Sequence, residues 1–235
     1  MKIAVFSDIH GNYEALESIY NDCKKNNIDE IIFLGDAIGL GPQPIKCLDF
    51  IMNHDITMVL GNHEERQMKE SNVDYHAVGN GHHLWVHKQM KKKHIDFISN
   101  LPIYIEREYN GKKFIFAHFF LKSMKHNNLY YPVEIINDKE ELKRIKDKMK
   151  WDYIFVGHHH YFYEYKDLGV VDVGPSGCVY DNKTHYYIIN IDKDITYEKK
   201  IIEYDRKSFE NSFKEVFNTY DNEHNLSMRF FGVKL

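Results

Sequence analysis

Side chains that can bind metals follow several short apolar segments of this 235-residue sequence. Asp8 and His10 come just after the apolar run Lys2–Phe6, and Asp36 and Asn62 follow two later runs, each behind a glycine. Residues two apart in extended chain point the same way, so Asp8 and His10 can reach one metal ion. A solvated loop, a helix cap or an Asx turn explains each residue singly. Three successive segment ends of this kind favour a metal site.

Histidines extend the set. His158 and His160 follow Gly157 after the apolar run Tyr153–Val156, and they share one face of an extended chain. His118 ends another apolar run further back in the chain. A surface histidine cluster and a structural histidine at a strand end are the alternative interpretations of these two groups.

Together the candidates supply nitrogen and oxygen ligands and no thiolate, a set that suits a pair of divalent ions such as manganese, iron or zinc. Asp36 is the best candidate for a carboxylate that bridges the two ions. Two metals roughly 3.5–4 Å apart commonly clamp the attacking and leaving oxygens in phosphoryl transfer. The full ligand set is Asp8, His10, Asp36, Asn62, His118, His158 and His160.

The first 60 residues must position half of this set. Apolar segments at Lys2–Phe6, Ile31–Leu34 and Thr57–Leu60 predict strands, and amphipathic spacing predicts helices around Leu16–Cys23 and Ile45–Met52. Helix-linked strands of this kind form parallel sheets with right-handed crossovers. Functional groups gather beyond the carboxyl ends of such strands. Asp8, Asp36 and Asn62 occupy those places.

The remaining elements are less regular. Gly79–Asn100 and Lys139–Lys150 predict helices, and Asn110-Gly111 predicts the turn of a hairpin. A last helix carries Phe209 to Tyr220 on one face. Without internal repeats or a linker, residues 1–235 are predicted to form one domain. Further strands are expected at Tyr153–Val156, Val170–Val173, Thr184–Ile191 and Ile195–Tyr204.

Composition excludes several classes of protein. A net charge of −4 gives no support to a nucleic-acid binder, and no apolar run approaches the roughly 20 residues of a membrane-spanning helix. The apolar start is too short for a signal peptide. Cys23, Cys47 and Cys178 are widely spaced, which argues against a disulfide framework and fits a reducing compartment. We therefore expect a cytoplasmic protein with no membrane partner.

The ordered motifs Asp8-x-His10, Gly35-Asp36, Gly61-Asn62-His63-Glu64, His118 and Gly157-His158-x-His160 resemble the five-part signature of the calcineurin-like metallophosphoesterase superfamily. The segment Gly39–Pro44 looks like a loop of its small bacterial and archaeal members. The resemblance covers about residues 1–190. It implies an α/β fold, a four-layer α/β/β/α sandwich of two mixed sheets flanked by helices.

The resemblance also implies roles for single residues. Asp8, His10, Asp36 and His160 correspond to ligands of the first metal; Asp36, Asn62, His118 and His158 correspond to those of the second. It implies attack on phosphorus by a metal-bridging hydroxide. His63 would contact the phosphate or protonate the leaving oxygen. Asn12 corresponds to a position beside the phosphate, with a helix cap as the alternative.

Two departures from the family pattern stand out. Phe119-Phe120 follows His118 where the family usually has glycine, which makes His126 an alternative ligand. His159 replaces a common threonine, and we expect it at the surface or behind the ligands. The histidines at 82, 83, 87 and 94 are expected to be exposed on a helix.

The predicted function is hydrolysis of phosphodiesters or phosphomonoesters of small molecules, with diesters favoured. Two divalent ions are the expected cofactors, with manganese preferred and iron, zinc or nickel as alternatives. Glu64 after Gly61-Asn62-His63 resembles the corresponding motif of the protein phosphatases. The Asp-Arg-Gly of those enzymes, with its phosphate-holding arginine, is absent. A dinucleoside polyphosphate hydrolase and a non-enzymatic metal-binding scaffold are further alternatives. The sequence leaves the substrate, the native metal and the oligomeric state open.

Overall fold

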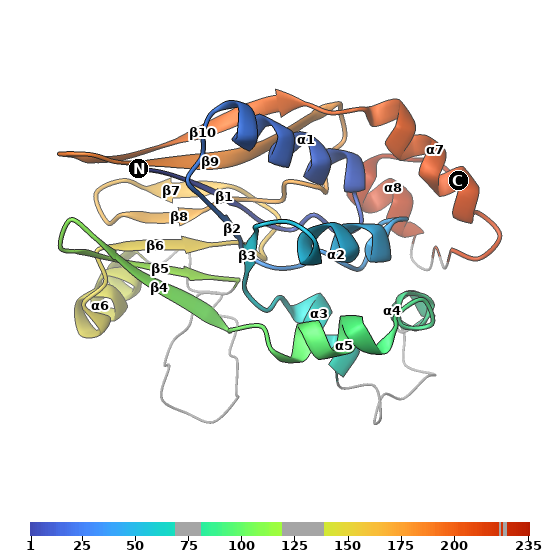
Figure 1. The fold of residues 1–235 in the computed structure, drawn as a ribbon, viewed down its shortest axis with the longest axis horizontal. Helices are drawn as coiled ribbons and strands as arrows, with labels where there is room; N and C mark the ends of the chain where they lie inside the picture. The colour runs from blue at the N-terminus through green and yellow to red at the C-terminus, as the bar shows by residue number, and fades with distance from the viewer. Residues whose placement is uncertain (69–80, 119–138, 221, 223–224) are drawn as a thin grey trace.

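The computed structural model describes residues 1–68, 81–118, 139–220, 222 and 225–235. Its described strands form two five-stranded sheets, and both sheets mix parallel with antiparallel pairs (Figure 1). The first sheet has the order β10 (Ile195–Glu203), β9 (Lys183–Ile191), β1 (Lys2–Phe6), β2 (Glu30–Phe33), β3 (Thr57–Met58). The second has the order β4 (Tyr104–Tyr109), β5 (Lys112–Ala117), β6 (Tyr153–Val156), β8 (Val170–Asp172), β7 (Tyr163–Tyr165).

Strand β1 is buried on both faces, and its side chains alternate between two cores. Ala4 and Phe6 pack in the core that the helices α1 (Tyr13–Lys25) and α2 (Pro44–Met52) cover. Ile3 and Val5 pack in the core between the two sheets. A strand that is buried on both sides needs an apolar residue at every position, which explains the continuous apolar run.

The outer face of the second sheet is covered by α6 (Lys139–Met149), whose Leu142 packs among residues of β5, β6 and β8. The layers are therefore helix, sheet, sheet, helix, which confirms the predicted α/β/β/α sandwich. At the end of the sandwich where β1 ends lie α7 (Arg206–Val216) and α8 (Leu226–Phe231) (Figure 1). None of the described helices has the length and apolar character needed to cross a membrane.

The predicted hairpin is confirmed, with left-handed φ angles of 51° at Asn110 and 70° at Gly111 joining β4 to β5. The helical structure expected at Gly79–Asn100 is confirmed over most of its described part, where it forms two helices, α4 (Gly81–His87) and α5 (Lys92–Ser99). The second helix starts anew because the ring of His94 accepts a hydrogen bond from the Lys91 N–H. Strand β7 and the short helix α3 (Asn62–Met68) have no counterpart in the sequence prediction.

Candidate metal centre

The carboxyl ends of strands from both sheets meet at one edge of the sandwich. Asp8 and His10 follow β1, and Asp36 follows β2. Asn62 opens α3 after β3. His118 follows β5, and His158 and His160 follow β6 in the second sheet. The structure thus brings all seven predicted ligand residues to one place.

The Asp36 carboxylate lies between two groups of ligands. Its Oδ2 is 3.6 Å from His10 Nε2 and 3.2 Å from His118 Nε2. His10 belongs to the ligands that follow β1, whereas His118 comes from the second sheet. The Asp36 carboxylate therefore faces ligand residues of both groups.

On the first side, three ligand atoms converge. Asp8 Oδ1 lies 3.6 Å from His10 Nε2 and 3.5 Å from His160 Nε2, and the two ring nitrogens are 2.9 Å apart. Asp8 is fully buried, and its Oδ1 has no hydrogen-bond partner among the described residues. A buried carboxylate oxygen without a partner is costly, and a bound cation would remove that cost.

On the second side, the Asn62 side-chain oxygen is the common contact. It lies 2.9 Å from His118 Nε2 and 3.0 Å from His158 Nδ1. Ligand atoms of Asp36, His118 and His158 all lie within 4.8 Å of one another. Two nitrogens and a carboxylate that face one another in this way form a site that a divalent cation fits.

Backbone carbonyls orient two of the histidines. His10 Nδ1 donates to the Ile38 carbonyl at 3.2 Å, and His118 Nδ1 donates to the Leu34 carbonyl at 2.8 Å. In both rings this contact leaves Nε2 turned toward the carboxylates. Metal-binding histidines commonly use such a second hydrogen bond to hold their tautomer and orientation.

The carboxylates and imidazoles of the cluster shift one another's pKa values. Burial alone would raise the pKa of Asp8 and Asp36, but the neighbouring histidines hold both well below the ordinary value. Burial alone would lower the pKa of His118, but the Asp36 carboxylate raises it to about 9. Burial, together with the charge of His118, lowers the pKa of His158 to about 4. The carboxylates are thus held ionised, the form that binds metal.

The backbone is strained at these residues. Of the ten non-glycine residues with positive φ in the described chain, five are predicted ligands. Each such residue costs roughly 1–3 kcal/mol and persists where the surroundings impose it, commonly at functional sites. The φ values are 54° at Asp8, 47° at His10, 62° at Asp36, 77° at His158 and 55° at His160.

Two motif glycines leave no room for a side chain, because atoms of the ligand motifs lie directly against them. A Cβ at Gly61 would lie 2.2 Å from Asp36 Oδ1. A Cβ at Gly157 would lie 2.0 Å from Ser7 Oγ and 2.8 Å from Asp8 Oδ2. Any side chain at either position would displace a predicted ligand or its support.

Glu64 holds the segment that carries Asp36, a role that the sequence analysis missed. Its carboxylate is fully buried and accepts hydrogen bonds from the backbone N–H groups of Asp36 at 2.8 Å, Ala37 at 2.9 Å and Ile38 at 3.1 Å. Burial and the nearby Asp36 raise the pKa of Glu64 to about 8. The available signal was its position in the motif, which only the family resemblance could interpret.

The expected exposure of the helical histidines is wrong for residues 82, 83 and 94, which are 3%, 9% and 0% exposed. The ring of His83 lies 5.2 Å from that of His63, which in turn lies 4.7 Å from that of His10. Burial lowers the pKa of His83 to about 3. The sequence pattern could not separate buried from exposed histidines, because imidazole is common in both environments.

His63 borders the cluster with Nε2 4.0 Å from Asp36 Oδ2, and its side chain is 15% exposed. Burial lowers its pKa well below the ordinary value. Asn12 is fully buried, where its oxygen accepts from the Ala15 N–H at 3.1 Å and its amide donates to the Gly177 carbonyl at 2.9 Å. These contacts favour the alternative that Asn12 caps α1, and its contact with substrate stays a prediction.

The two departures from the family pattern have different outcomes. His159 points away from the ligand groups toward Asp172, with its Nδ1 3.0 Å from Asp172 Oδ2. Phe119, Phe120 and the alternative ligand His126 lie outside the described residues.

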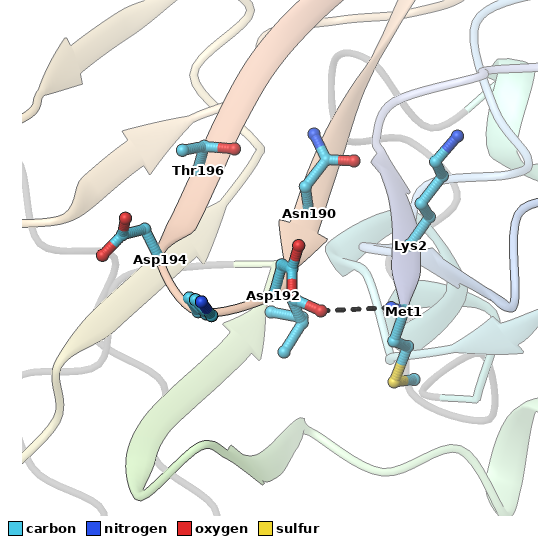
Figure 2. A pocket seen from close by; sticks show the side chains of 8 residues that line it. Met1, Lys2, Asn190, Asp192, Asp194 and Thr196 are labelled. Carbon is cyan, nitrogen blue, oxygen red and sulfur yellow. Dashed lines mark hydrogen bonds between the residues drawn. The ribbon is translucent and has the colours of Figure 1, made fainter.

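A surface pocket of about 790 Å³ lies elsewhere, at the amino end of β1 (Figure 2). Met1, Lys2 and Asn190 line it together with the turn between β9 and β10. Asp8 lies beyond the other end of β1, so this pocket is separate from the candidate metal centre.

Comparison with known proteins agrees with this geometry. The sequence model of the calcineurin-like phosphoesterase family matches residues 1–162. The chain belongs to the calcineurin-like phosphoesterase family. Family members typically bind divalent metals, and the His and Asp groups described above could hold them.

Relatives and solved structures agree with this membership. An uncharacterized protein of Methanocaldococcus jannaschii is 33% identical over 191 residues, 80% of this chain and 74% of its own. Serine/threonine-protein phosphatase 2 of Escherichia coli is 27% identical over 175 residues, 66% of this chain and 78% of its own. A metallophosphoesterase from Sphaerobacter thermophilus has the same fold, with a TM-score of 0.67 at 19% identity over 97% of this chain and 99% of its own.

Proposed function

We propose that this phosphoesterase is a hydrolase of small phosphoesters that works with two divalent metal ions sharing Asp36. The observation that carries the proposal is the position of Asp36 Oδ2, between His10 Nε2 at 3.6 Å and His118 Nε2 at 3.2 Å. Each of these nitrogens belongs to a separate group of convergent ligands. One ion would be held by Asp8, His10, Asp36 and His160, and the other by Asp36, Asn62, His118 and His158.

The bound ions would supply Lewis-acid activation of water and of the phosphoryl oxygens. The protein's own residues supply orientation and proton transfer. The carbonyls of Ile38 and Leu34 fix the rings of His10 and His118, and Glu64 fixes the backbone at Asp36. The ligands therefore need little rearrangement when metal binds.

His63 is proposed to contact the substrate phosphate or to donate a proton to the leaving oxygen. Its Nε2 faces the ligand cluster, whereas its Nδ1 is buried, and a Cβ at Gly39 would lie only 2.1 Å from Nδ1. The substrate can therefore reach Nε2 only. The lowered pKa leaves the ring uncharged at neutral pH, and in the Nε2–H tautomer it can donate a hydrogen bond to the phosphate. Proton transfer to the leaving oxygen would require the ring to be protonated first, as imidazolium.

Diesters and monoesters remain the two candidate substrate classes, with diesters preferred. The similarity to a bacterial serine/threonine-protein phosphatase supports a protein phosphatase as the second candidate. The missing Asp-Arg-Gly argues against it, because that arginine would hold the substrate phosphate. A scaffold role is less well supported, since all seven ligand positions carry metal-binding side chains.

The test is hydrolysis of an aryl phosphodiester and of the matching monoester, after chelation and return of Mn²⁺. We expect metal-dependent diester turnover that disappears in Asp36→Asn and persists in Asp194→Asn, a matched change at an exposed turn. Turnover of the monoester alone would favour the phosphatase. Bound metal without turnover of either ester would favour the scaffold, and absence of metal binding would reject the metal centre.

A further inference from the structure

Cys178 lies within the loop 173–182 between β8 and β9, directly against the first ligand motif. The loop follows β8, and its backbone donates two hydrogen bonds to the end of β1, Ser176 N–H to the Ser7 carbonyl at 2.9 Å and Gly177 N–H to the Asp8 carbonyl at 3.0 Å. A Cβ at Gly177 would lie 1.9 Å from the Ile9 carbonyl oxygen, so no side chain separates the two segments. The position of Cys178 beside the ligands is therefore set by backbone contacts.

The thiol of Cys178 belongs to the same cluster as two predicted ligands. Its Sγ and ligand nitrogens of His10 and His160 all lie within 4.8 Å of one another. The residue is only 8% exposed. Asp8 Oδ1 lies 3.6 Å and 3.5 Å from the Nε2 atoms of the same two histidines. Sulfur, imidazole and carboxylate thus face one small volume.

We propose that Cys178 is a further ligand of the metal ion held by Asp8, His10 and His160, which makes that half of the centre a mixed sulfur, nitrogen and oxygen site. The inference rests on the metal centre proposed above and departs from the expectation of a thiolate-free ligand set. Coordination forms a sulfur–metal bond and releases the thiol proton to solvent. A soft sulfur ligand favours zinc, cobalt or iron over manganese at that position.

The alternative is that Cys178 is a small apolar residue of the core, as buried cysteines often are. It does touch an apolar cluster that includes Phe209 and Phe213. The other two cysteines show what that role looks like in this protein. Cys23 and Cys47 are fully buried in the core between the first sheet and its helices, and neither belongs to a group of potential metal ligands among the described residues.

Cobalt distinguishes these roles, because a thiolate bound to Co²⁺ produces a charge-transfer band in the near ultraviolet that imidazole and carboxylate ligands do not. The full-length chain is stripped of metal and titrated with Co²⁺, while bound cobalt is measured independently. We expect the band in the wild type and in Cys47→Ala, and its loss in Cys178→Ser and Cys178→Ala with cobalt still bound. Cys178→Ser should also weaken Zn²⁺ binding about 10–100-fold, and Mn²⁺ binding less.

Two results would overturn the inference: cobalt-loaded wild type without the band, or a band that survives in Cys178→Ser. Serine preserves the size of the side chain, so a folding defect of the alanine variant cannot hide the outcome. Failure of the wild type to bind any cobalt would instead count against the proposed metal centre as a whole.

Discussion

Replacing Glu64 by glutamine tests whether the buried carboxylate holds the metal-binding segment in place. Its two oxygens accept three backbone hydrogen bonds, one on Oε2 from Asp36 and two on Oε1 from Ala37 and Ile38. Glutamine has nearly the same shape but replaces one oxygen by an NH₂ group, which cannot accept. At least one buried backbone N–H must therefore lose its partner.

The magnitude follows from that count. One buried N–H without a partner costs about 1–3 kcal/mol. The pKa of about 8 leaves Glu64 largely protonated at pH 7, so the substitution removes little negative charge there. The lost hydrogen bond therefore sets the expected loss of stability. For a chain of this length, each 1 kcal/mol lowers Tm by about 2–4 °C.

The assay is urea unfolding of the metal-free protein, monitored by circular dichroism. It compares the wild type with Glu64→Gln and Glu215→Gln. Glu215 is exposed on α7, so the same substitution there should change the free energy of unfolding by no more than about 0.5 kcal/mol. Metal affinity of Glu64→Gln should also fall about 10–100-fold, the usual cost of losing a group that orients a ligand. Equal stability and equal metal affinity of Glu64→Gln and wild type would refute the positioning role.

Three further substitutions test other parts of the structure. His63→Ala should retain bound metal and lower kcat roughly 10²-fold, and unchanged turnover would remove His63 from the mechanism. Gly61→Ala should abolish metal binding, because its Cβ would lie 2.2 Å from a ligand carboxylate oxygen. The control is Gly111→Ala, whose Cβ has no atom within 4 Å. It should cost only about 1 kcal/mol of stability and leave metal titrations unchanged. Burial alone would raise the pKa of Asp22, but the Lys200 ammonium, 2.7 Å from the Asp22 carboxylate, helps to lower it. The stability that this pair contributes is complete above pH 3.8 and is lost as the pH falls through the pKa of Asp22 in the folded protein. Asp22→Asn should therefore make the free energy of unfolding fall less steeply at acid pH. The same acid dependence in wild type and variant would contradict this.

Local pattern was enough to locate most strands, helices and candidate ligands of this protein. A strand such as β1 that is buried on both faces must be apolar at every position, and the polar residues after it then stand out. Parallel strands bring their carboxyl ends to one edge, so Asp8, Asp36 and Asn62 could be placed together without coordinates. The order of the layers, with two sheets packed between helices, came from the resemblance to a family and not from hydrophobic periodicity.

Contacts between the two sheets were beyond local pattern. His118 and His160 come from the second sheet, yet they meet Asp36 and Asp8 of the first at 3.2 Å and 3.5 Å. Hydrophobic periodicity reports which face of an element is buried, but it does not report which distant element covers that face.

The supporting residues show the same limit more sharply. Glu64, His83 and Cys178 read as an acid, a helical histidine and an isolated thiol, and only the fold brings them to the candidate centre. Their roles depend on three-dimensional neighbours that are up to about 170 residues away in the chain, as Cys178 is from His10. Glu64 can be buried because three backbone N–H groups donate to its carboxylate and offset the cost of burial.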